Sequence, residues 1–256
     1  MSCKISKKRR IGFTLMEILV VIFIITLLLA LLMPAIGKVK SMALRMKCAN
    51  NLRQIHIAVD LYTQTNDDTY PCAEDPVSYI VGGDPNINYW LWMGRGWRFF
   101  VAPHLNIDNI KKNPSVLFCS MDKAAKENFE SASYAYSMAF YHGPEQIDSI
   151  SSYKNTYGNP KDELKPSIPQ KCTNVARPSE KILIGEWFSN HFTIQGGDPG
   201  WWGWEGSRNY LFADGQVRFL RAKEIREAND KLPDANLTKR GIKGRDWPSD
   251  TEPNSR

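Results

Sequence analysis

The stretch KKRRIGFTLMEILVVIFIITLLLALLMPAI, residues 7–36, decides the fold of this chain. Four cations open it, and from Ile18 to Ile36 every residue is apolar or small except Thr26. At ~1.5 Å per residue in an α-helix, the apolar part reaches most of the way across a bilayer core of about 30 Å. The sequence therefore predicts one membrane-spanning helix with its positive charges on the N-terminal side.

Two features of this stretch bear on its orientation and its role. The cations precede the apolar run, so the positive-inside rule leaves the N-terminus in the cytoplasm and sends the rest of the chain outward. Glu17 lies at the cytoplasmic end of the run, where an ionisable side chain is costly in lipid and by default functional. A plain anchor does not explain Glu17, and a secretory signal peptide would have a shorter apolar region with a small-x-small cleavage site.

The segment GFTLME, residues 12–17, resembles the prepilin peptidase recognition sequence of type IV pilins and type II secretion pseudopilins. The pattern of that family is a short basic leader ending in Gly, then Phe, then a Glu as the fifth mature residue. The resemblance implies cleavage between Gly12 and Phe13 by prepilin peptidase, followed by N-methylation of the Phe13 amine. It also implies that Glu17 meets the charged N-terminus of a neighbouring subunit during assembly.

The helical pattern continues beyond Gly37 with a different character. Apolar side chains recur at spacings of three and four residues, which is typical of a helix with one buried face: they are Leu44, Cys48, Leu52, Ile55, Val59 and Tyr62. We expect one helix from about residue 14 to 63, with a bend at Pro34 and an end at Asn66-Asp67-Asp68.

The predicted fold class is α+β, pilin-like, with the long N-terminal helix packed on a small antiparallel sheet. The predicted parts are a leader (1–12), a transmembrane and assembly helix (13–36), its amphipathic half (37–64), a periplasmic domain (65–231) and a polar tail (232–256). Residue types and turn signals predict short strands and helices in the domain: strands over 115–119, 133–140, 181–186, 208–213 and 216–220, and helices over 97–105 and 222–229.

Two further blocks narrow the resemblance. Residues 48–55, CANNLRQI, and residues 209–217, NYLFADGQV, resemble blocks of a pseudopilin-like group abundant in planctomycetes and their relatives. That group carries one His ten residues before the Asp of the second block and another directly after its Gly. Here these positions hold Trp204 and Gln216, so no role of those histidines transfers to this chain.

The second block also predicts a turn. Asp214-Gly215 between alternating apolar runs indicates a type I′ hairpin, in which both turn residues have positive φ. A turn role accounts for Asp214 without a metal. Calcium binding, known in some major pseudopilins, is the alternative, but no EF-hand-like acidic ladder surrounds this residue.

Five cysteines are present, and if the leader is removed, Cys3 goes with it and four remain. An even number in an exported domain suggests disulfides, with three pairings open and buried free thiols as the alternative. The candidates are Cys48, Cys72, Cys119 and Cys172. No C-x-x-C or zinc-spaced Cys/His cluster occurs, so no metal site and no cofactor are expected.

The sequence contains no G-x-S-x-G, HExxH, P-loop or dinucleotide motif, and we expect no enzymatic activity. Glu186 paired with Asp214 or Glu205 would make a glycosidase dyad, but nothing in the sequence places these acids together. Clustered Trp side chains bind sugars or partners when exposed, or else fill the core of a loop-rich domain. The candidates for ligand binding are Trp201, Trp202 and Trp204.

The net charge is +6, and the five cations among residues 1–12 account for all but one unit of it. The basic balance therefore describes the leader, and no nucleic-acid partner is expected. The resemblance implies a structural subunit of a secretion-system pseudopilus or pilus-like filament in the inner membrane. Its partners would be prepilin peptidase, other pilin-like subunits and the assembly machinery. The alternative is a membrane-anchored carbohydrate- or protein-binding module that does not polymerise.

Overall fold

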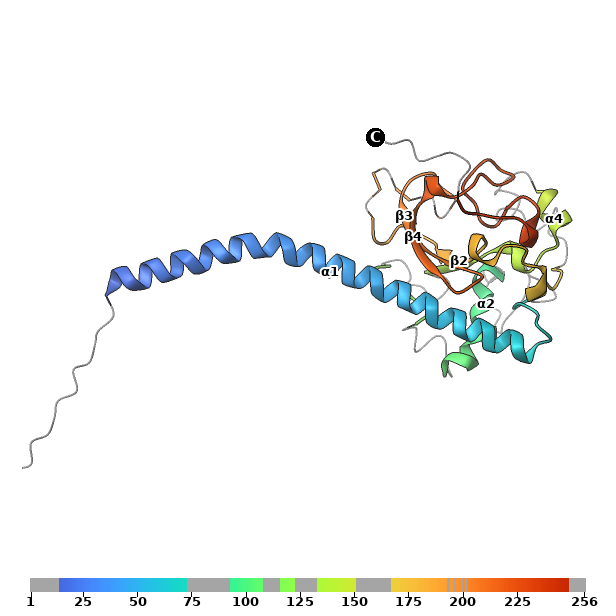
Figure 1. The fold of residues 1–256 in the computed structure, drawn as a ribbon, viewed down its shortest axis with the longest axis horizontal. Helices are drawn as coiled ribbons and strands as arrows, with labels where there is room; N and C mark the ends of the chain where they lie inside the picture. Colours follow the sequence, from blue (N-terminus) through green and yellow to red (C-terminus); the bar gives the residue numbers. More distant parts are fainter. Residues whose placement is uncertain are drawn as a thin grey trace, which may run out of the picture. The chain divides into compact units, whose positions relative to one another are not determined.

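The structure is a computed structural model that describes residues 14–72, 93–107, 116–122, 133–150 and 167–248, the last range without residues 193, 196, 199 and 201. The chain divides into two units, residues 1–43 and residues 44–256. Helix α1 (Leu15–Thr65) contributes to both units, and the sheet and the remaining helices belong to the second (Figure 1).

The first unit consists, in its described part, of the N-terminal portion of α1. Its large apolar side chains are exposed all around the helix, from Leu15 to Met42. Such a helix has no buried stripe within its own chain, which is the pattern of a segment that is covered by lipid or by other subunits. Leu15–Thr65 is the one helix in the described part of the chain that is long and apolar enough to cross a membrane.

The last turns of α1 end where the sequence predicts. The Asn66 side-chain amide donates to the carbonyl of Tyr62 at 2.8 Å and so satisfies one of the final carbonyls. Asp67 and Asp68 then adopt left-handed backbone conformations, with φ of 52° and 54°, which turn the chain away from the helix axis.

The sheet of the second unit has four strands in the order β1-β2-β3-β4, and every neighbouring pair is antiparallel. The strands are β1 (Tyr134–Tyr136), β2 (Ile182–Glu186), β3 (Ser207–Phe212) and β4 (Val217–Arg221). The predicted α+β class, a long helix with a small antiparallel sheet, is confirmed.

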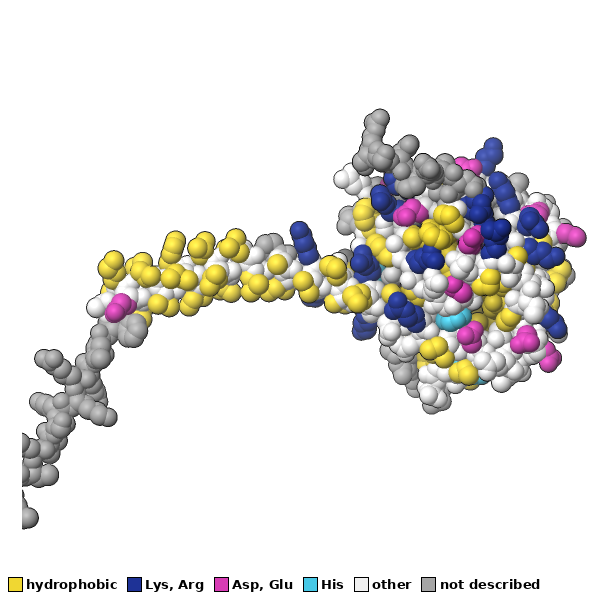
Figure 2. Space-filling view, in the orientation of Figure 1, with side chains coloured by type: hydrophobic (Ala, Val, Ile, Leu, Met, Phe, Trp, Pro, Cys, Tyr) yellow, Lys and Arg dark blue, Asp and Glu magenta, His cyan; other side chains and the backbone are white. Residues whose placement is uncertain are grey.

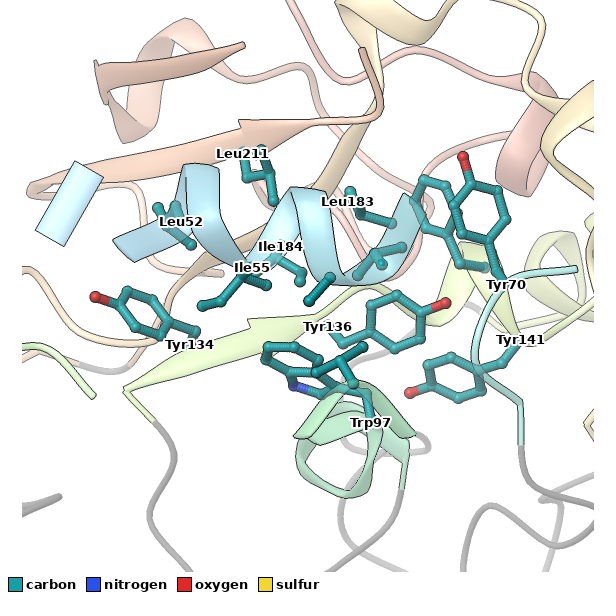
Figure 3. Close-up of a cluster of buried hydrophobic side chains, with 14 of the residues drawn as sticks. Leu52, Ile55, Tyr70, Trp97, Tyr134, Tyr136, Tyr141, Leu183, Ile184 and Leu211 are labelled. Carbon is teal, nitrogen blue, oxygen red and sulfur yellow. The ribbon is translucent and has the colours of Figure 1, made fainter. Parts of the chain in front are cut away.

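The core lies between the C-terminal part of α1 and the sheet (Figure 3). Leu52 and Ile55 of α1 are fully buried in one cluster with Ile184 of β2 and Tyr136 of β1. Trp97 of helix α2 (Met93–Val101) joins this cluster, with its ring centroid 6.1 Å from that of Tyr136. Each buried aliphatic side chain stabilises the fold by about 1.5–3 kcal/mol. The predicted apolar stripe of α1 therefore holds this part of the helix against the sheet.

The remaining described helices are short: η2 (Ala102–Leu105), η3 (Met138–Phe140), α4 (Pro144–Asp148), η4 (Cys172–Asn174), η5 (Pro178–Glu180), η6 (Ala222–Glu224) and η7 (Gly241–Lys243). Three expectations are corrected here. The strand expected over 133–140 is limited to β1, and residues 138–140 form η3. Residues 116–119 form turns rather than a strand, and the helix expected over 222–229 is limited to η6. In both segments tertiary contacts decide the backbone, as where Phe118 accepts a hydrogen bond from the Asn51 side chain.

The segment after residue 231 has a polar composition, but its described part, 232–248, is folded against the domain. Leu237 and Ile242 are fully buried. The Asp246 carboxylate accepts the backbone N–H of Ile182 at 2.7 Å and pairs with the buried Lys181 ammonium at 3.1 Å. Scattered apolar residues and buried hydrogen bonds hold this segment, and neither produces a helical or strand period in the sequence.

The β3–β4 hairpin is present, but its turn is not the predicted type I′. Gly215 has a φ of 84°, whereas Asp214 does not have a positive φ. The N–H of Gly215 donates to the carbonyl of Phe212 at 3.0 Å, and Asp214 Oδ1 accepts the N–H of Gln216 at 3.0 Å. The connection is therefore longer than two residues, with one left-handed glycine, as in hairpins built on a type I turn.

Gly215 is also pressed against α1. A Cβ at this position would lie 2.5 Å from the His56 ring, so both the backbone conformation and the contact require glycine. We expect Gly215→Ala to lower the free energy of unfolding by about 2 kcal/mol or more. Thermal denaturation of the full chain in detergent measures the effect.

Gly143→Ala is the matched control, because Gly143 has a φ of −69° and an added Cβ would make only ordinary contacts, the nearest at 3.4 Å. Equal melting temperatures for the two variants would contradict this account of the hairpin.

Candidate functional site

The processing residues Gly12 and Phe13 lie outside the described residues, so the geometry begins at Thr14. Thr14 precedes the first turn of α1, and Glu17 is the third residue of the helix. The backbone N–H and the hydroxyl of Thr14 each donate to Glu17 Oε2 at 2.8 Å, and the N–H of Glu17 points back to Thr14 Oγ1 at 3.3 Å. This reciprocal arrangement is a capping box, which satisfies free N–H groups at the start of a helix.

The capping box gives Glu17 a partner within its own chain. The carboxylate also lies at the N-terminus of α1, where the helix dipole favours negative charge. The apolar side chains that follow, from Ile18 to Ile36, are exposed. Glu17 is thus a carboxylate held by Thr14 at the edge of an exposed apolar surface.

A second group of reactive side chains meets inside the domain. Cys48 of α1 and Cys119 of the loop 116–122 have their sulfur atoms 2.6 Å apart. His191 Nε2 lies 3.4 Å from Cys119 Sγ and 3.1 Å from Glu186 Oε1. These four side chains, hereafter the thiol cluster, are buried, and their ligand atoms all lie within 4.8 Å of one another. Thiolate, imidazole and carboxylate donors in such a set are of the kinds that bind zinc.

The carboxylate of Glu186 is held in place from β3. Asn209 donates its backbone N–H to Glu186 Oε2 at 2.8 Å and its side-chain amide to Oε1 at 2.9 Å. Burial disfavours the charged form of His191, but hydrogen bonds and charges from Cys48 and Glu186 outweigh it and raise the pKa of the imidazole to about 9. The imidazole of His191 and the carboxylate of Glu186 therefore form a close pair beside the two sulfurs.

The thiols of Cys48 and Cys119 have pKa values that are shifted in opposite directions. The hydrogen bond from Cys119 lowers the pKa of the Cys48 thiol to about 4 despite burial, with a further contribution from His191. The same hydrogen bond, together with burial and the charge of Glu186, raises the pKa of the Cys119 thiol well above its ordinary value. Sequence reasoning named both cysteines but missed Glu186 and His191 as their neighbours, because these residues are far apart in the chain and form no motif.

The other two cysteines lie elsewhere in the domain, and both are half-buried. The Cys72 thiol is hydrogen-bonded to Ser167, and the Cys172 thiol to Thr63 and Tyr70. Burial is the main cause that raises the pKa of each thiol.

The three tryptophans proposed for ligand binding have different positions. Trp201 lies outside the described residues. Trp202 packs edge-on against Trp187, with ring centroids 4.9 Å apart, beside the second core cluster. Trp204 is 42% exposed, so it alone of the two described side chains presents a free aromatic face.

The acids considered as a hydrolytic dyad are in different environments. Glu186 is buried and occupied by Asn209 and His191. Asp214 is exposed in the hairpin turn, where its carboxylate accepts the N–H of Gln216. The carboxylates of Glu186 and Asp214 therefore have separate structural roles.

Comparison with known proteins identifies the N-terminal segment. Residues 7–33 match the model of the prokaryotic N-terminal methylation motif, which includes Gly12, Phe13 and Glu17. No curated protein and no solved structure matches the chain. Proteins with this motif are processed by prepilin peptidase, and they are typically structural rather than enzymatic. The chain thus carries a prokaryotic N-terminal methylation motif at residues 7–33, and a long apolar helix runs through and beyond that motif.

Proposed function

We propose that this protein is a pseudopilin-like structural subunit that assembles through α1 into a secretion-system pseudopilus or a pilus-like filament. The observation that carries this proposal is Glu17, a carboxylate fixed at the start of an apolar helix whose side chains are exposed on all sides. An anchor alone requires the apolar surface but has no use for the charge.

Cleavage before Phe13 creates a positively charged amine four residues before Glu17. N-methylation of that amine leaves its positive charge in place. In lipid each of these charges needs a partner. The Phe13 amine of one subunit and the Glu17 carboxylate of its neighbour supply partners for each other. The pairing energy sets the axial register of the subunits, while apolar contacts along α1 provide the cohesion.

The cations of the leader support an orientation in which the N-terminus begins in the cytoplasm. Residues 44–256 then lie on the periplasmic side of the inner membrane. In that compartment the domain is presented on the outside of the assembled filament or at the membrane surface.

The second candidate function is a membrane-anchored binding module that does not polymerise. The exposed Trp204 supports a binding role for the domain. The two functions differ in what they require of Glu17, so one experiment separates them.

We expect Glu17→Ala and Glu17→Gln to be cleaved by prepilin peptidase but to reduce incorporation into filaments at least tenfold. Glu17→Gln is the informative variant, because Gln still accepts the capping hydrogen bonds and lacks only the charge. Processing is measured as the mass of the mature chain. Assembly is measured by immunoblot of sheared or cross-linked filaments.

Thr14→Ala is the matched control, since it removes the hydroxyl of the capping box and keeps the carboxylate of Glu17; it should assemble. Wild-type assembly by Glu17→Gln would sink the proposed charge pairing. Wild-type behaviour of all variants, without filaments, would favour the anchored binding module.

A further inference from the structure

A cavity of about 680 Å³ opens on the surface of the domain beside η6 and η7. Seven Lys and Arg side chains line it, against a single acidic one, Glu227. Figure 2 shows Lys and Arg side chains on the face of the domain in view, with Asp and Glu side chains among them. We call this feature the basic cavity.

The charge of the basic cavity is local. Outside the leader the chain has a net charge of +1. The excess of Lys and Arg that lines the cavity is therefore a local feature and does not reflect the charge of the whole domain. Glu180 pairs with both Arg177 at 3.3 Å and Arg245 at 3.7 Å. Like charges crowded into one concavity destabilise the compact state, and an anionic ligand offsets that repulsion.

The cavity wall is fixed by a buried polar network. The ammonium of Lys181 donates to Thr238 Oγ1 at 2.5 Å and pairs with Asp246, and Asp246 anchors the backbone of β2. Burial lowers the pKa of Lys181, and the charge of Asp246 opposes that effect. The network clamps both ends of the segment 238–246, from which four of the seven cations project.

The loop between these anchors is held as well. Arg240 has a φ of 67°, and its N–H donates to the Asp148 carboxylate at 2.7 Å. Gly241 follows with a φ of 53°, packed so closely that a Cβ would lie 3.0 Å from the backbone of Pro144. The side chains of Lys239, Arg240 and Lys243 are therefore presented from a preformed backbone, which lowers the entropic cost of binding a ligand.

Trp204 lies on the same cavity and provides an aromatic face. An indole ring stacks on the apolar face of a sugar ring, whereas Lys and Arg bind its carboxylate or sulfate groups. A volume of about 680 Å³ lies within the range of small-molecule sites, about 300–1,000 Å³. Duplex nucleic acid, in contrast, is bound along its phosphate backbone by an extended basic surface.

We propose that the basic cavity binds a short acidic oligosaccharide, with Trp204 stacking on one sugar ring and the surrounding cations pairing with carboxylate groups. This activity goes beyond filament assembly, because it needs only the domain and an exposed cavity. A subunit with such a site would hold an acidic glycan at the filament or membrane surface.

The test is a titration of the full chain in detergent micelles with hexagalacturonate, with neutral maltohexaose and with a single-stranded oligonucleotide of equal charge. We expect hexagalacturonate to bind, and its affinity to fall as salt rises. Neutral maltohexaose should bind at least tenfold more weakly. Trp204→Ala and the double variant Lys239→Glu/Arg240→Glu should each weaken hexagalacturonate binding at least tenfold without lowering the melting temperature.

Lys171→Glu is the control, since Lys171 is exposed but does not line the cavity. No binding of hexagalacturonate, or binding that Trp204→Ala leaves unchanged, would overturn the proposal. So would an oligonucleotide that binds more tightly than hexagalacturonate, because it would show a nucleic-acid site instead. Filament assembly is scored separately, so a failure here leaves the proposed role of Glu17 standing.

The thiol cluster carries a second, independent inference. Two thiolates that share one zinc ion lie about 3.8 Å apart, given tetrahedral angles and Zn–S bonds of about 2.3 Å. The sulfurs of Cys48 and Cys119 are 2.6 Å apart, which is much too close for that arrangement. With both sulfurs bonded to each other, Glu186 still has His191 and Asn209 as partners, so no buried charge is left alone.

We infer that Cys48 and Cys119 form a disulfide once the domain has left the cytoplasm, an inference that rests on the proposed periplasmic location. The two thiols lose two protons and two electrons, and a disulfide-exchange protein of that compartment is reduced to its dithiol. The bond would tie α1 to the loop 116–122 across 71 residues, while Cys72 and Cys172 stay as thiols.

The chain is extracted without reductant, alkylated, digested and analysed by mass spectrometry. We expect a linked Cys48–Cys119 peptide pair and alkyl labels on Cys72 and Cys172. Reduction should lower the melting temperature by on the order of 10 °C. The double variant Cys48→Ala/Cys119→Ala should be insensitive to reductant, whereas Cys72→Ala, the matched control, should keep the shift.

A processed chain with Cys48 and Cys119 both alkylated, or with one bound zinc per chain, would overturn the disulfide alone. An unprocessed chain with reduced cysteines would instead contradict the periplasmic location, which belongs to the proposed function.

Discussion

An α-helix with apolar side chains on every side needs a cover that its own chain does not provide. From Ile18 to Ile36 the helix exposes its apolar residues, so water is excluded as its lasting environment. Lipid or the helices of other subunits meet this need, and the prepilin-type motif at residues 7–33 agrees with both. The carboxylate of Glu17 lies at the edge of that apolar surface, where a charge is costly in lipid, so its presence requires an explanation.

The second half of α1 buries one apolar face against the domain. Its apolar residues occupy one stripe, and Cys48, Leu52, Ile55 and Val59 are fully buried against the domain. The same helix therefore supplies the apolar surface of the first unit and part of the core of the second. In the described part of the domain the sheet has four short strands, and α1 contributes apolar side chains to the core that packs against them.

Local patterns predicted much of this structure. The three-four spacing of apolar residues identified the buried face of α1, and alternation around Asp214-Gly215 identified β3 and β4. The turn type was wrong because the sequence signal does not determine loop length, and here Gly215 alone takes the left-handed conformation against His56. Residues 232–248 were misjudged as a tail because hydrogen bonds from Asp246 and isolated buried side chains leave no periodic signal.

The candidate sites in the domain are formed by tertiary contacts, so the sequence did not predict which of their residues lie together. Glu186 of β2 and His191 of the following segment meet Cys48 of α1 and Cys119 of the loop 116–122 through the tertiary fold alone. The basic cavity combines four separated parts of the chain, which are Arg177, Trp204, residues 223–227 and residues 239–245. The amino-acid composition gave no sign of a basic site in the domain, since the net charge outside the leader is close to zero.

The central claim is that this chain is a processed, pilin-like subunit whose mature form begins at Phe13. The most direct test is the mass and sequence of the N-terminal peptide of the protein isolated from its native membrane. The account predicts a chain that starts at Phe13 with a methylated amine. A chain that starts at Met1 or Ser2, or one cleaved after Ala35, would contradict it.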